Sequence, residues 1–146
     1  MAISLRENIC RAGKLPRSDA VLMGRAELLK TEDHDLLEAV LILGQSTTSL
    51  ARLMKTTPRD IRYRVGRLCR HLTSRRFLDA ARALPYLDKE TGELARLRFC
   101  QGASHRELCC RFNITWHRLR RRLDHLAAQI ETIRRMTRVE RHVQEE

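Results

Sequence analysis

Apolar residues recur every three or four positions along most of the chain, with polar residues between them. One such stripe comprises Ile61, Val65, Leu68 and Leu72, and a longer one comprises Leu119, Leu123, Leu126, Ile130 and Ile133. This spacing places apolar side chains on one face of an α-helix. The pattern therefore predicts an all-α fold that ends in a long helix.

The stretch 104–123 indicates two helices joined by a tight turn. Ser104 is placed to cap the first helix, and Glu107 follows three residues later to complete a capping box. Asn113 stands where the chain reverses, and asparagine accepts a positive φ more readily than most residues. Thr115 then caps the second helix. We expect a helix-turn-helix motif here.

A second copy of this stretch lies upstream, at an offset of 58 residues. Without a gap, the offset aligns Gly44 with Gly102, Ser46 with Ser104, and Thr57 with Thr115. Apolar positions follow the same register, as when Ile61 aligns with Leu119. Identical residues and apolar positions in one register indicate a duplicated structural unit.

The repeat predicts tandem helix-turn-helix units. We expect a weakly structured N-terminus over 1–16 and a first unit over 17–72. A connecting helix over 73–85 follows. The second unit, with an extended last helix, covers 86–138, and 139–146 is expected to be a charged tail.

Positive charge is concentrated in two places. The chain has a formal net charge of +11 and a pI of about 10.5. Residues 58–82 hold eight Lys and Arg against two Asp and Glu, and residues 104–126 hold six against two. Both segments contain the second helix of a motif, so the charge repeats with the fold. This distribution predicts a polyanionic partner, namely double-stranded DNA.

The outward residues of the two second helices are the candidate DNA contacts. Residues near the N-terminus of a recognition helix meet base edges, and those further along meet phosphates. The predicted base-edge or groove contacts are Pro58, Arg59, Arg62, Tyr63, Trp116, His117, Arg120 and Arg121. The predicted phosphate contacts are Arg64, Arg67, Arg106, Arg118 and Arg122. The alternative for the arginines is a solvated helical face, and for Trp116 and Tyr63 it is partial core packing.

The second half of the chain resembles a known family. Leu84-Pro85, the run Gly92–Phe99, the run Gly102–Leu108, and Ile114-Thr115 through Arg122-Leu123 carry the resemblance. Over about residues 84–128 the chain is similar to the C-terminal promoter-reading domain of bacterial sigma factors, of the extracytoplasmic-function type. The first half, about 36–72, resembles the same helix-turn-helix class through Leu50-Ala51.

The resemblance implies promoter DNA contact by the last helix and RNA polymerase contact by the preceding helices. Asn113 and Lys55 stand where such motifs usually have glycine. The chain has no room for the sigma-factor domain that melts the promoter. We therefore expect a regulator that is not a complete sigma factor.

The sequence is compatible with three functions. The first is a sequence-specific DNA-binding regulator of transcription. The second is a protein-interaction module that binds RNA polymerase or another regulator through the sigma-like fold. The third is the DNA-binding part of an enzyme such as a recombinase. We do not expect an enzyme, because the sequence lacks a catalytic constellation.

The remaining features bear on the expected localisation, cofactors and oligomeric state. The sequence has no membrane span or signal peptide, which favours a cytoplasmic, nucleoid-associated bacterial protein without membrane contact. Cys100, His105, Cys109 and Cys110 lack a Cys-x-x-Cys pair, so no metal or other cofactor is expected. Finally, the 4-3 spacing of apolar residues over 119–136 suggests a homodimer through the last helix.

Overall fold

The computed structural model describes residues 19–144, in which all regular structure is helical. The all-α expectation is therefore confirmed for this part of the chain. The chain divides into two compact units, Met1–Ser74 and Arg75–Glu146. The expectation for residues 1–16 lies outside the described residues. None of the helices described has the length and apolar character of a membrane span.

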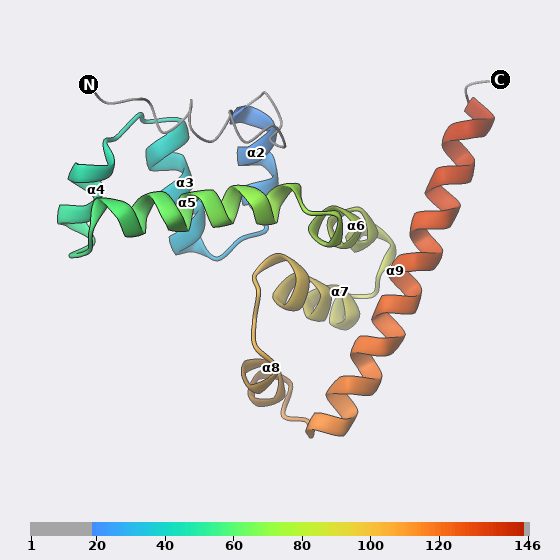
Figure 1. Cartoon of the computed structure of the whole chain (residues 1–146). Helices are drawn as coiled ribbons and strands as arrows, with labels where there is room; N and C mark the ends of the chain where they lie inside the picture. Colours follow the sequence, from blue (N-terminus) through green and yellow to red (C-terminus); the bar gives the residue numbers. More distant parts are fainter. Residues whose placement is uncertain (1–18, 145–146) are drawn as a thin grey trace. The chain divides into compact units, whose positions relative to one another are not determined.

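The described part of the first unit, residues 19–74, contains four helices, drawn in blue to green in Figure 1. They are α2 (Asp19–Ala26), α3 (Thr31–Leu41), α4 (Thr47–Leu53) and α5 (Pro58–Thr73). Helix α5 packs against the other three, and its expected stripe from Ile61 to Leu72 is buried. The side chains of Ser46 and Thr57 cap α4 and α5, and Pro58 takes the first helical position of α5, where no N–H is needed.

The second unit runs from yellow-green to red in Figure 1. Its elements are α6 (Arg75–Ala83), a 3₁₀ turn η1 (Leu84–Tyr86), α7 (Lys89–Ala95), a π-helical turn η2 (Arg96–Cys100), α8 (His105–Phe112) and α9 (Trp116–Gln144). The predicted capping box is present at the start of α8, where Ser104 and Glu107 exchange hydrogen bonds of 3.2 and 2.7 Å. Helix α9 continues through Gln144, so residues 139–144, expected as a tail, are helical.

The offset found in the sequence also relates the two backbones. Gly44 and Gly102 have φ of 65° and 70°, and Lys55 and Asn113 have φ of 53° and 49°. The turn bonds match as well. The N–H of Thr56 donates to the Ala51 carbonyl at 2.9 Å, and the N–H of Ile114 donates to the Cys109 carbonyl at 3.1 Å. The two units therefore repeat one local backbone geometry.

Helix α6 differs from its expected role as a connector. Shifted by the same offset, α2 falls on residues 77–84, within or beside α6. Phe77, Ala80 and Ala83 are fully buried, and α6 packs against η2 and α9. It is the first helix of the second unit, because its apolar face completes that unit's core.

The first part of the long apolar stripe of α9 packs into the core of its own unit. Leu119 and Leu126 are fully buried, and Leu123 and Ile130 pack against the same core. The expectation of a homodimer rested on the 4-3 spacing of apolar residues over 119–136. Helices α6 and α8 and the turn η2 supply this core, whereas Met136 further along α9 is 61% exposed, so the homodimer stays a prediction.

Replacing Lys55 with glycine is expected to stabilise the protein. Lys55 holds a left-handed conformation that costs a side-chain-bearing residue free energy and costs glycine little. We expect the free energy of unfolding to rise by about 0.5–1 kcal/mol, as measured by urea denaturation. Asn113→Gly should gain less, because asparagine tolerates this conformation. Equal or lower stability of Lys55→Gly would show that Lys55 is not strained.

Candidate nucleic-acid interface

The N-terminal half of α5 presents one buried and one exposed face. Ile61 is 1% exposed and anchors the helix, whereas Arg59 and Arg62 point to solvent. Tyr63 is 66% exposed, so the core-packing alternative for this side chain is wrong. The sequence therefore places two guanidinium groups and a phenol on one open helical surface.

The start of α9 likewise presents one buried and one exposed face, with a tryptophan instead of a tyrosine. Leu119 anchors the helix, and His117, Arg118, Arg120 and Arg121 are exposed. Trp116 is 47% exposed, and its ring lies edge-on to that of His105 on α8, with 4.5 Å between centroids. Trp116 is thus partly packed and partly open, between the two alternatives expected for it.

Most of the predicted DNA-contacting arginines are free of internal ion pairs. Within residues 19–141, no carboxylate oxygen lies within 4.0 Å of these guanidinium groups. They are Arg59, Arg62, Arg67, Arg106, Arg118, Arg120 and Arg121. All seven are exposed, so each can meet an external anion without breaking an internal contact.

Arg64 and Arg122 are the exceptions, and they correct the expectation that both are phosphate contacts. Arg64 lies 2.7 Å from Asp33 and 3.8 Å from Glu32, and Arg122 lies 2.6 Å from Glu90. The pairs Arg64–Glu32 and Arg122–Glu90 are related by the repeat offset at both ends. This repeated ion pair ties α5 to α3 in the first unit and α9 to α7 in the second, so we leave both arginines out of the interface.

An acidic residue that the sequence analysis missed lies at the start of α5. Hydrogen bonds from the hydroxyls of Thr57 (2.7 Å) and Thr56 (3.1 Å) lower the pKa of Asp60. Asp60 is therefore ionised at neutral pH. The repeat offset aligns it with Arg118, so the first turn of α9 is the more cationic of the two. The two helices consequently present different charge patterns.

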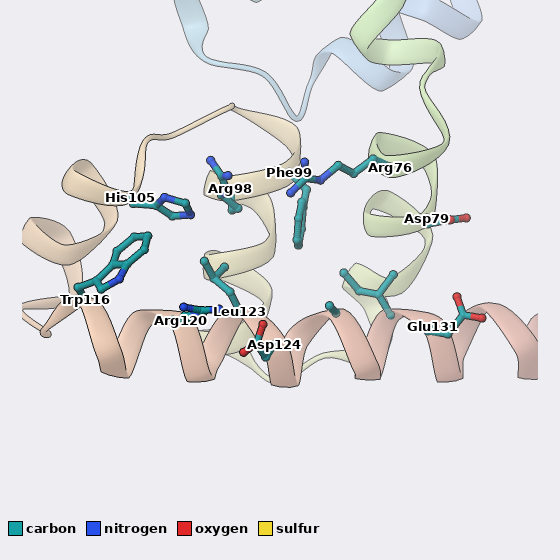
Figure 2. A pocket seen from close by; sticks show the side chains of 12 residues that line it. Arg76, Asp79, Arg98, Phe99, His105, Trp116, Arg120, Leu123, Asp124 and Glu131 are labelled. Atoms are coloured by element: carbon teal, nitrogen blue, oxygen red, sulfur yellow. The ribbon is translucent and has the colours of Figure 1, made fainter.

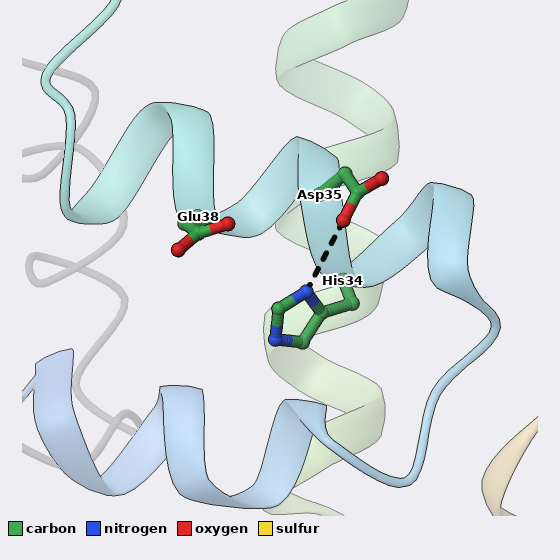
Figure 3. Close-up of side chains that lie close together, drawn as sticks. All are labelled: His34, Asp35 and Glu38. Atoms are coloured by element: carbon green, nitrogen blue, oxygen red, sulfur yellow. Dashed lines mark hydrogen bonds and ion pairs between the residues drawn. The ribbon is translucent and has the colours of Figure 1, made fainter.

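Among the described residues, Cys100, His105, Cys109 and Cys110 are not brought together as a group of candidate metal ligands. Burial raises the pKa of Cys100 to about 11, which keeps the thiol protonated and a poor ligand. One other group of candidate ligands lies on α3, where His34 Nδ1 is 3.3 Å from Asp35 and Glu38 is one turn away (Figure 3). Its two carboxylates are exposed, and exposed acidic groups commonly lie together without an ion, so we assign it no metal.

Comparison of the chain with protein-family models, curated proteins and solved structures finds no match in any of the three.

Proposed function

We propose that this chain binds double-stranded DNA in a sequence-dependent way, using the N-terminal halves of α5 and α9 as reading helices. The observation that carries the proposal is the set of seven exposed arginines without internal ion pairs, most of them on corresponding helices of two repeated units. A surface that only maintained solubility would not need to keep these groups unpaired on matched helices.

The geometry of each helix supports base reading as well as phosphate binding. Both reading helices begin at a threonine cap with an open first turn, the part of a recognition helix that enters the major groove. Arg62 and Arg120 lie one turn into their helices, at positions that the repeat aligns. An arginine in such a position can donate two hydrogen bonds to a guanine edge.

The resemblance to the sigma-factor promoter-reading domain supports transcription regulation as the biological role. In this proposal the second unit reads one DNA element and the first unit reads another. The two elements differ in sequence, because the outward residues of α5 and α9 differ. Arg67 and Arg106 bind phosphates beside them.

The proposal is tested by comparing a selected duplex with bulk DNA. We expect selection from a random pool to enrich a defined site that binds at least about 10³-fold more tightly than unrelated DNA at the same salt. With Arg67, Arg106 and Arg118 on phosphates, raising salt from about 50 to 200 mM should weaken binding by about 40-fold. Fluorescence anisotropy measures both quantities. Equal affinity for selected and unrelated duplexes would contradict sequence reading.

A further inference from the structure

A groove of about 470 Å³ opens in the second unit, beside the reading helix (Figure 2). It lies between α6, the π-helical turn η2, the start of α8, and α9. Phe99 and Trp116 supply aromatic surface, and Leu123, Ala127 and Ile130 supply aliphatic surface along α9. Its volume is within the range of small-molecule binding sites.

The same face of the first unit is closed. The residues aligned with Phe99, Leu123, Ala127 and Ile130 are Leu41, Val65, Cys69 and Leu72. All four are at most 2% exposed, whereas Ala127 is exposed and the other three groove residues are partly exposed. The groove is therefore not a general consequence of the repeated fold. It results from side chains of the second unit that differ from their counterparts in the first.

One side-chain difference brings charge into the groove. Arg98 stands where the first unit has buried Val40. Its guanidinium donates to the Ala103 carbonyl at 2.9 Å, and burial together with the nearby charge of Arg76 lowers its pKa. Arg76 reaches from α6 to lie over the Phe99 ring, 4.8 Å from its centroid (Figure 2). The groove thus has two guanidinium groups in its lining, one of them over the Phe99 ring.

The groove is lined by three arginines and three carboxylates, but two of the carboxylates are paired with an arginine outside the lining. Asp79 and Glu131 are both held by Arg134, at 3.8 and 3.1 Å. In contrast, Arg76, Arg98 and Arg120 have no carboxylate partner within 4.0 Å among residues 19–141. Asp124 is the remaining acid of the lining. An excess of unpaired positive charge beside aromatic surface suits a ligand that is both anionic and apolar.

We propose that this groove binds a small organic anion, with a flat apolar body against Phe99 and Trp116 and a carboxylate, phosphate or sulfonate group near the guanidinium groups. Arginine recognises such oxyanions through paired N–H donors, and aromatic faces bind flat apolar groups. Trp116 and Arg120 also belong to the proposed DNA surface. If the proposed function holds, an occupied groove changes DNA affinity.

The test uses anilinonaphthalenesulfonate, a flat aromatic anion, with the full-length protein and no DNA. Trp116 is the only tryptophan of the chain and lines the groove, so its fluorescence responds to a probe bound there, and the variants below localise the site. We expect saturable binding with quenching of Trp116, and at least about 10-fold weaker binding of neutral phenylnaphthylamine. Equal affinity for the two compounds would overturn the anion requirement. Displacement by naphthoate indicates a carboxylate ligand, and displacement by naphthyl phosphate indicates a phosphate ester.

Two adjacent alanines provide matched variants. Ala127 lines the groove and Ala128 does not, and both are exposed on α9. Ala127→Phe should weaken probe binding by at least about 10-fold, whereas Ala128→Phe should leave it unchanged. Arg76→Gln should remove most of the preference for the sulfonate over the neutral compound. Wild-type affinity in Ala127→Phe would overturn the proposal. Because DNA is absent, this result stands whether or not the chain binds DNA.

Discussion

Replacing Arg62 and Arg120 together with alanine is expected to weaken binding to the selected duplex by a factor of about 10² to 10⁴. Both side chains are exposed, lack internal ion pairs, and lie at matched positions of α5 and α9. Each guanine that is no longer bound by an arginine removes about 1–3 kcal/mol of discrimination. Affinity for unrelated DNA should fall much less. Anisotropy titrations of the two duplexes measure the difference.

The matched control is the double replacement of Arg64 and Arg122 with alanine. It removes the same charge from the same helices, at positions slightly further along each helix. These arginines are paired with Asp33 and Glu90, so we expect a small loss of DNA affinity and a loss of stability below about 1 kcal/mol per pair. If this control weakened specific binding as much as the first pair does, net charge rather than base reading would account for the effect.

Leu119→Ala is expected to lower the free energy of unfolding of the second unit by about 2–5 kcal/mol. Leu119 is fully buried at the start of α9 and belongs to the core cluster of that unit. Its truncation leaves a cavity beneath the proposed reading surface. Because Trp116 lies one helical turn away, its fluorescence follows the transition during urea denaturation. DNA binding should fall with the population of the folded unit.

Leu119→Met keeps the buried position apolar and changes only the shape of the side chain. Methionine conserves most of the volume, so this replacement should cost less than about 1.5 kcal/mol and retain DNA binding. A small, equal cost for both variants would mean that Leu119 does not anchor α9. Leu119 faces the core, away from the outward arginines. The Leu119→Met variant therefore also tests whether the proposed DNA-binding surface tolerates a change in the core beneath it.

Local features of the fold were predictable because they depend on short-range chemistry. The caps at Ser46, Thr57 and Ser104 follow from side chains that satisfy the first N–H groups of a helix. The turn at Asn113 follows from its tolerance of positive φ. The buried stripe of α5 follows from its periodicity. The repeat offset then extends each local prediction to the other unit.

Features that depend on distant contacts were not predictable in the same way. The ion pair between Arg64 and Asp33 joins residues 31 positions apart in the sequence. The pattern of α5 alone therefore predicted Arg64 as a DNA contact. The repeat did indicate an ion pair, because its offset aligns Glu32 with Glu90 as well as Arg64 with Arg122. The role of α6 was missed because its aligned residues in α2 differ, and only packing reveals the shared position. The groove depends on substitutions whose combined effect appears only in three dimensions.

The most direct test of the central claim is a map of backbone amide resonances in isotope-labelled protein with and without the selected duplex. We expect the largest chemical-shift changes to cluster at residues 59–63 of α5 and 116–121 of α9, since Pro58 has no backbone N–H. Changes confined to other helices, with both of these segments unaffected at saturation, would contradict it.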